Sequence, residues 1–257
     1  MAGWEIIVYI PVYNSEMQLP DLLARFKKTE RILKEMGAEF KSIIFVNDKS
    51  TDNTSNIIKE SIRSMPYLCV VDKVKNEGPA AAIFDGMDAA SKEITEPEKT
   101  ILIRMDSDLE HNPEDIPLMI KPIIENSAKI VAGYVPFDSR SGNAIKEFNE
   151  KTGVEQSSKF LGINIPQFCP GFIAMKGDLF LKIHPLIAEK AKEFRKKYGE
   201  DMVSIDFISL VTAKRLGEKI IAVKLSPIED KYIKKQPEEK IEHYRDCHKK
   251  TMEFLES

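Results

Sequence analysis

Two alternating patterns along the first half of the chain constrain its fold most strongly. Short runs of β-branched and other apolar residues, typical of buried strands, lie between longer segments whose apolar residues repeat every three or four positions. Strands are expected at residues 6–10, 43–46, 68–71, 100–105 and 129–132, and helices at residues 19–36, 51–65, 80–90 and 113–126. This alternation predicts an α/β fold with a Rossmann-like, mainly parallel sheet and helices on both faces.

The second half of the chain is less regular. Its patterns predict strands at residues 168–175 and 219–225, helices at 185–198, 204–216 and 241–255, and a charged segment at 231–240. Residues 138–162 are polar and contain three glycines, which is typical of a loop that could close over a ligand. No segment has the composition of a linker that would divide the chain into separate domains.

Composition narrows the classes of function. A chain of 257 residues with 42% hydrophobic residues can bury a sizeable core, and a net charge of -3 gives no support for nucleic-acid binding. Cys69, Cys169 and Cys247 lack the spacing of a disulfide framework or a zinc site, which favours a reducing, intracellular setting. The first apolar segment follows no basic stretch, and no window approaches the ~20 apolar residues of a membrane span. We therefore expect a cytoplasmic protein whose membrane contact, if any, is peripheral.

Two polar clusters follow predicted strands at the point where each strand ends. The first is VNDKSTDNT at residues 46–54, and the second is DSDLEHNPE at residues 106–114. Turn chemistry accounts for Asn, Asp, Ser and Thr in one loop, but not for two acidic loops in the same position. Because ligands of parallel α/β sheets bind outside the carboxyl ends of the strands, these clusters predict a binding site there.

The second cluster has the composition of a divalent-cation site. Asp106 and Asp108 can turn two carboxylates toward one cation, and Glu110 could complete the set. Oxygen-only ligands suit Mg²⁺ or Mn²⁺, which often also bind substrate phosphates. A capped turn before Pro113 is the alternative interpretation, and Asn112 already serves that purpose. No glycine-rich phosphate loop of the dinucleotide-binding or P-loop type is present, so a nucleotide would have its phosphates held by a metal.

Four segments in this order resemble family 2 glycosyltransferases of the GT-A fold. They are IPVYNSE, VNDKSTDNT, NEGPAAAIFDG and MDSDLEHNPEDIP. The string DSDLEHNPE is most similar to the dolichol-phosphate mannosyltransferase branch and to related polyprenyl-phosphate hexosyltransferases. The resemblance extends from Ile6 to about Leu225, and it is more specific in the first half than in the second.

The resemblance implies an organisation and a set of roles. Residues 1–230 would form the GT-A domain, with a nucleotide-sugar-binding half at 1–135 and an acceptor half at 136–230, followed by a charged segment and helix at 231–257. Asp206 would be the general base, and Asp106, Asp108 and Glu110 would bind Mg²⁺ or Mn²⁺. The residues implied in nucleotide binding are Pro11, Tyr13, Glu16, Asp48, Lys75, Asn76, Gly78, Asp106 and Ser107.

The implied activity is an inverting, metal-dependent transfer of a hexose from a GDP- or UDP-sugar to a polyprenyl or dolichyl phosphate or to a glycan hydroxyl. Two positions depart from the branch pattern. Ile208 replaces an acidic residue, and the arginine usual after the fifth strand is absent unless Arg140 substitutes for it. A catalytically weak nucleotide-sugar-binding or scaffold protein on the same fold is therefore the alternative. A sugar nucleotidyltransferase would require a glycine- and arginine-rich first loop, which IPVYNSEM lacks.

Overall fold

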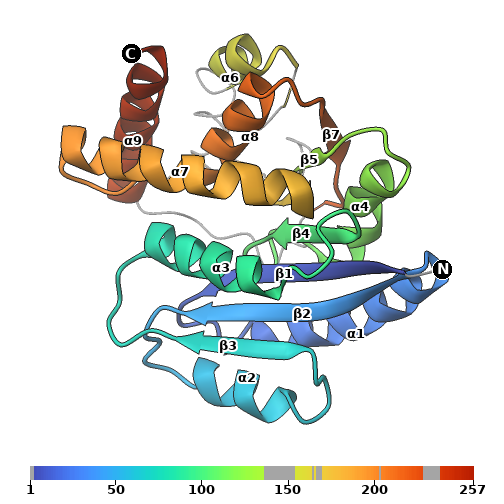
Figure 1. Cartoon of the computed structure of the whole chain (residues 1–257). Helices are drawn as coiled ribbons and strands as arrows, with labels where there is room; N and C mark the ends of the chain where they lie inside the picture. The colour runs from blue at the N-terminus through green and yellow to red at the C-terminus, as the bar shows by residue number, and fades with distance from the viewer. Residues whose placement is uncertain (1–2, 136–153, 164, 166–169, 203, 228–237) are drawn as a thin grey trace.

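The structure is a computed structural model that describes residues 3–135, 154–163, 165, 170–202, 204–227 and 238–257. It contains one seven-stranded sheet with the strand order β3-β2-β1-β4-β6-β5-β7. The strands are β1 (Trp4–Val12), β2 (Ala38–Asn47), β3 (Leu68–Asp72), β4 (Thr100–Arg104), β5 (Ile130–Tyr134), β6 (Ile173–Lys176) and β7 (Ile220–Lys224). Both halves of the chain contribute strands to this sheet (Figure 1).

The sheet is parallel except at one strand. β1 pairs in parallel with β2 and β4, and β5 pairs in parallel with β7. β6 runs antiparallel to both of its neighbours, β4 and β5. The predicted mainly parallel sheet is confirmed, but the sequence patterns did not indicate the reversal of β6. That reversal brings the segment that precedes β6 to the edge where β4 ends.

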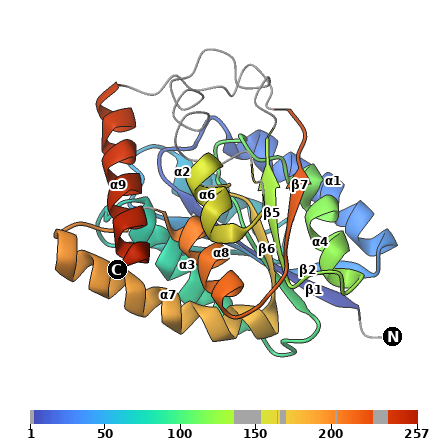
Figure 2. The ribbon, with the colours of Figure 1, turned by 90° about the horizontal axis from the view of Figure 1, so that it is seen from above.

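Helices cover both faces of the sheet, as the alternation predicted. They are α1 (Leu19–Glu35), α2 (Thr54–Ser61), α3 (Pro79–Glu93), α4 (Ile116–Ile124), α6 (Val154–Leu161), α7 (Gly177–Tyr198), α8 (Ile205–Arg215) and α9 (Glu238–Glu256), with a short 3₁₀ turn η1 (Pro113–Asp115) before α4. In Figure 2, α6 lies over α8, which it contacts, and α7 crosses below them. No helix in the described part of the chain is both long and apolar enough to cross a membrane.

The strands separate two apolar cores. Along β1, Ile7 and Tyr9 face a core shared with α3, α7 and α8, whereas Ile6 and Val8 face a core shared with α1 and α4. Successive side chains of a strand point to opposite faces, so a strand buried on both sides is apolar at nearly every position. The continuous apolar runs of the sequence follow from this burial.

Three expectations need correction. Residues 154–161 form helix α6 inside the stretch expected to be a loop, because Leu161 packs into the core shared with α8. The expectation for residues 138–153 lies outside the described residues. α7 begins at Gly177, well before Pro185, because Leu179 and Phe180 are buried in the same core and their packing outweighs the backbone hydrogen bond that proline lacks. Residues 113–126 form a 3₁₀ turn and then α4.

Candidate active site

The loops after β1, β2, β3 and β4 are joined to one another at the carboxyl edge of the sheet. The Ser15 and Ser107 hydroxyl oxygens lie 3.1 Å apart and connect the loop after β1 with the loop after β4. The Glu16 amide donates to Asp52 at 3.1 Å, and the Asn53 amide donates to the Glu16 carboxylate at 2.9 Å. These contacts place the two polar clusters at one edge, as the sequence predicted.

Asp48 joins the loop after β2 to the loop after β3. Its carboxylate is buried and accepts hydrogen bonds from the backbone amides of Glu77 at 2.9 Å and Gly78 at 2.8 Å. The Lys73 ammonium group lies 3.9 Å from the same carboxylate. Gly78 has φ +86°, a conformation that favours glycine, and α3 begins at the next residue. Asp48 therefore fixes the shape of the third loop.

The other residues implied in nucleotide binding lie on this edge with differing exposure. Pro11 is the last residue but one of β1 and is half-buried, and Tyr13 is 49% exposed. Asn76 is exposed, and the exposed Lys75 pairs with Glu77 at 2.8 Å. Tyr13 thus supplies an exposed aromatic residue at this edge, and aromatic rings of this kind can stack on other rings.

Asp106 lies in a cluster of charged groups around a buried arginine. The Arg104 guanidinium contacts both oxygens of Asp106, at 2.9 and 3.0 Å, and donates to the carbonyl of Gly171. It also lies 3.4 Å from the Asp206 carboxylate. His111 Nδ1 is 3.7 Å from Asp106. Residues from β4, the loop after it, the segment before β6 and helix α8 therefore meet at one point.

Asp206 is the most deeply buried carboxylate of this cluster, with 8% of the residue exposed. Burial raises the pKa of Asp206, the positive charge of Arg104 lowers it, and the negative charge of Asp106 raises it. The net direction is upward. A carboxyl group with a raised pKa, next to a half-exposed carboxylate, has the properties of an acid–base group.

Gly171 allows the cluster to pack closely. Its φ is +62°, and a Cβ atom there would stand 2.6 Å from His111 Cε1 and 3.0 Å from both Arg104 and Asp106. A side chain at this position would require these groups to shift. The Gly171 backbone consequently closes the cluster on the side of β6.

Asp108 and Glu110 lie further along the same loop, both half-buried. The Asp108 carboxylate accepts from the Glu110 amide at 3.1 Å, and Leu109 between them has φ +64°. Among the described residues, no three His, Cys, Asp or Glu side chains converge as a metal site would require. Asp106 and Asp108 nonetheless supply the hard oxygen donors that Mg²⁺ and Mn²⁺ prefer, and such ions usually complete their coordination with water and substrate phosphates.

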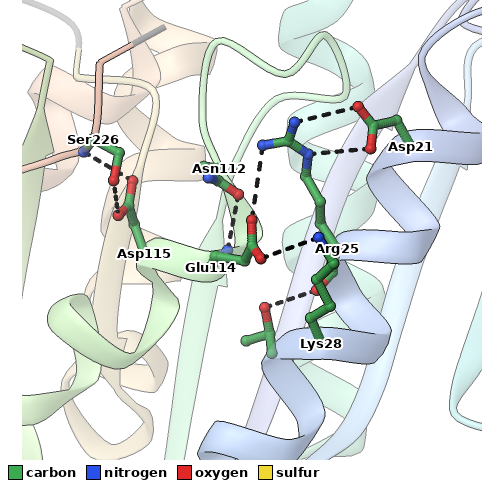
Figure 3. A network of polar contacts seen from close by, with 8 residues as sticks. Asp21, Arg25, Lys28, Asn112, Glu114, Asp115 and Ser226 are labelled. Carbon is green, nitrogen blue, oxygen red and sulfur yellow. Dashed lines mark hydrogen bonds and ion pairs between the residues drawn. The ribbon is translucent and has the colours of Figure 1, made fainter. Parts of the chain in front are cut away.

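The end of the loop after β4 is held by polar contacts on two sides (Figure 3). The Asn112 side chain accepts from the Glu114 amide at 3.0 Å, which confirms the predicted cap, and Glu114 lies 3.6 Å from Lys28 of α1. On the other side, the Asp115 carboxylate accepts from the Ser226 amide and hydroxyl at 3.1 and 2.7 Å. The loop that carries Asp106 is thereby tied both to α1 and to the segment after β7.

Sequence reasoning assigned no role to Arg104, Gly171 or His111. A signal for Arg104 was present, because it is the only charged residue within the strand TILIR, and a charge in a buried strand requires a partner. The partners are Asp106, which is near in sequence, and Asp206, which is not. No local pattern could indicate that α8 brings Asp206 to β4.

The comparison with known proteins identifies the family. A sequence model described as glycosyl transferase family 2 matches residues 7–183. The chain belongs to this family. The expected resemblance is confirmed, and the matched part contains the loops after β1 to β4 together with Gly171.

Curated relatives of this family 2 member match different shares of the chain. An undecaprenyl-phosphate 4-deoxy-4-formamido-L-arabinose transferase of Pseudomonas fluorescens is 32% identical over 117 residues, which are 45% of this chain and 31% of the relative. The matched part is thus about a third of that relative's length. An uncharacterized protein of Methanocaldococcus jannaschii is 26% identical over 232 residues, covering 83% of this chain and 95% of the relative.

Solved structures of glycosyltransferases share the fold. A mannosyltransferase from Pyrobaculum calidifontis, in complex with GDP-Man and Mn²⁺, has a TM-score of 0.58 at 15% identity, covering 96% of this chain and 61% of that one. Mannosyl-3-phosphoglycerate synthase from Rubrobacter xylanophilus has a TM-score of 0.63 at 14% identity, covering 98% and 74%. At such identities the likeness shows the fold alone, and that fold is GT-A, as expected.

Proposed function

We propose that this family 2 member is an inverting, metal-dependent glycosyltransferase. It transfers a hexose from a GDP- or UDP-sugar to an acceptor, for which a polyprenyl phosphate is our first candidate and a glycan hydroxyl the second. The observation that carries the proposal is the meeting of Asp106 and Asp206 beside Arg104 at the edge where the first four loops are joined. The named relatives and the Mn²⁺ complex of the Pyrobaculum enzyme support it.

The donor half of the reaction follows from the loops. Tyr13 would contact the base, Lys75 and Asn76 would contribute to nucleotide binding, and Asp106 and Asp108 would hold Mg²⁺ or Mn²⁺ together with the diphosphate. When bound, the cation would offset the negative charge that grows on the departing nucleoside diphosphate. Asp48 holds the third loop in shape, so its contribution to nucleotide binding would be through Glu77 and Gly78 as well as by direct contact.

The acceptor half depends on Asp206. A hydroxyl acceptor attacks the face of the sugar opposite the diphosphate and has to lose a proton, which Asp206 would accept. A lipid phosphate is already anionic, so that Asp206 would only orient it.

In this proposal, residues 1–135 would bind the donor and residues 136–230 the acceptor, with residues 231–257 as an appended segment. Contact with a membrane surface would bring a lipid acceptor to Asp206.

Two experiments test this function. The first is a thermal-shift screen of GDP- and UDP-sugars with and without Mn²⁺, in which a cognate donor raises the melting temperature because it binds only the folded state. The second is transfer of labelled sugar to a polyprenyl phosphate or to a glycan, with wild type and Asp206→Asn. Loss of transfer in Asp206→Asn indicates a hydroxyl acceptor, and a milder decrease indicates a phosphate acceptor.

A nucleotide-sugar-binding or scaffold role is the second candidate. It is favoured by the pairing of both Asp106 oxygens with Arg104, which occupies part of the coordination capacity of that carboxylate. A melting-temperature increase with a nucleotide sugar, without transfer or donor hydrolysis in Mn²⁺, would support this role against catalysis. No shift with any donor would contradict nucleotide-sugar binding altogether.

A further inference from the structure

Arg104 places a fixed positive charge at the point where a divalent cation would bind. The residue is 6% exposed, and its guanidinium lies within 3.4 Å of both Asp106 and Asp206. A buried charge is costly unless it is paired and hydrogen-bonded. The two carboxylates and the Gly171 carbonyl provide these partners. Arg104 thus neutralises part of the negative charge that would otherwise attract a cation.

Of the two carboxylates, Asp106 has the closer contacts with the Arg104 guanidinium. Each of the two Asp106 oxygens contacts one guanidinium nitrogen, at 2.9 and 3.0 Å. A carboxylate oxygen has a second lone pair, so Asp106 can still bind a cation, but that cation would then stand close to the guanidinium. Two positive charges that share one carboxylate repel each other strongly in a partly desolvated site. The Gly171 carbonyl accepts a hydrogen bond from the guanidinium and so restrains it on the side of β6.

We propose that Arg104 is a positioning residue that holds Asp106 and Asp206 side by side and keeps the affinity of the donor-free protein for Mn²⁺ low. The cation then binds tightly only together with the diphosphate of the donor, whose negative charges compensate the guanidinium. This inference rests on the function proposed above. Mg²⁺ and Mn²⁺ are commonly held by one or two carboxylates plus substrate phosphates. Because Arg104 already contacts both oxygens of Asp106, a cation at this site would depend on the substrate phosphates for its remaining negative ligands.

The predicted change in Mn²⁺ affinity on loss of Arg104 has the opposite sign for this role and for a purely structural role. Loss of a residue that merely supports the loop would weaken Mn²⁺ binding, whereas loss of a repelling charge would strengthen it. Mn²⁺ binding to the full chain, measured by electron paramagnetic resonance without nucleotide, reports this directly. We expect Arg104→Met to bind Mn²⁺ about tenfold more tightly than wild type, since tenfold in affinity corresponds to a small part of a short-range charge repulsion.

Three variants serve as controls. Arg104→Lys keeps the charge and should bind Mn²⁺ like wild type. Arg104→Gln removes the charge but keeps a hydrogen-bond donor, so it provides a second neutral variant if Arg104→Met fails to fold. Arg25→Met is the matched control, because Arg25 is also buried and paired with a carboxylate, Asp21, at 3.2 Å. It should bind Mn²⁺ no more tightly than wild type.

The same comparison is made with Asp206→Asn as the parent. Without Arg104, Asp206 could take up a proton and conceal the loss of the positive charge, and asparagine at that position removes this compensation. Asp206→Asn alone should weaken Mn²⁺ binding, because it removes a negative charge, and adding Arg104→Met should strengthen it again. Neutral variants that bind Mn²⁺ no more tightly than their parents in either background would overturn the proposal.

A second measurement uses wild type alone, with GDP and UDP as probes. We expect one of them to strengthen Mn²⁺ binding by at least about tenfold, since the diphosphate supplies the missing negative charge. Tight Mn²⁺ binding that GDP and UDP strengthen no further, in a protein whose melting temperature a nucleotide sugar still raises, would contradict the inference about Arg104 but leave the proposed function intact. If neither GDP nor UDP changes Mn²⁺ binding and no nucleotide sugar raises the melting temperature, the proposed function and the pairing of cation with donor are overturned, while tighter Mn²⁺ binding by Arg104→Met would still support the repulsion by Arg104.

Discussion

Asp48 and Asp106 follow β2 and β4, the two strands that flank β1, yet their carboxylates have different partners. Asp48 is buried and accepts from two backbone amides, those of Glu77 and Gly78. The Asp106 side chain is 37% exposed and pairs with a side-chain cation, Arg104. Backbone amides cannot leave a carboxylate without rearranging the chain, whereas a guanidinium can share it with another cation. Asp48 is therefore suited to hold a loop, and Asp106 to bind the exchangeable ligand that the proposed function requires.

The largest expected effect is on the Asp106 side of this comparison. Asp106→Asn should lower the rate of sugar transfer about a thousandfold, because a neutral amide neither attracts the cation nor offsets charge in the transition state. Product formation from the cognate donor measures the change. If a folded Asp106→Asn protein keeps an activity within a few-fold of wild type, groups other than Asp106 compensate the charge that develops on the diphosphate.

The close packing around Arg104 predicts the next effect. Gly171→Ala should lower the free energy of unfolding by about 3 kcal/mol, because it combines left-handed backbone strain with a collision between its Cβ and His111. Gly199 has φ +74°, and a Cβ atom added there would meet nothing within 4 Å, so Gly199→Ala should cost only the backbone strain, about 1 kcal/mol. Denaturant unfolding of both variants measures the difference, and equal losses would show that the cluster relaxes around the new methyl group.

The Asp48 side of the comparison predicts a loss of stability. Asp48→Asn replaces an acceptor of two amide hydrogen bonds with a side chain that can accept from only one of them, so we expect a loss of about 2 kcal/mol in the free energy of unfolding. Asp85→Asn is the control, since Asp85 also pairs with Lys73 but its side chain is 43% exposed, and its loss should stay below about 1 kcal/mol. If Asp48→Asn unfolds like Asp85→Asn, the amides of the third loop do not depend on Asp48.

The smallest expected effect is a pH dependence at the end of the Asp106 loop. Burial raises the pKa of Asp115, the hydrogen bonds from Ser226 lower it, and the nearby Glu114 raises it, with a net upward direction. The folded state then holds the proton more tightly than the unfolded state. Stability should therefore fall as the pH rises from the ordinary aspartate pKa through the raised one, and stay constant above it. Asp115→Asn should remove this part of the pH dependence, which unfolding curves between about pH 3 and pH 7 test; an unchanged curve would assign it to other groups.

Local patterns in the chain were enough to predict the strands, most of the helices and the position of the two acidic loops. Burial on both faces of a parallel sheet demands continuous apolar runs, and polar residues that end such runs lie where ligands bind. These are local properties, which periodicity and composition record. The expected helix start at Pro185 was wrong, because the packing of Leu179 and Phe180 into the core is a tertiary property that local patterns do not record.

The assembly of the candidate site, by contrast, depends on the path of the chain through the sheet. The reversed direction of β6 brings Gly171 against Arg104, and the position of α8 brings Asp206 to the same guanidinium. An ion pair between residues so far apart in sequence follows from that path, which no spacing of residues records. The charge of Arg104 was visible in the strand TILIR, but its meaning depended on which carboxylates the fold placed beside it.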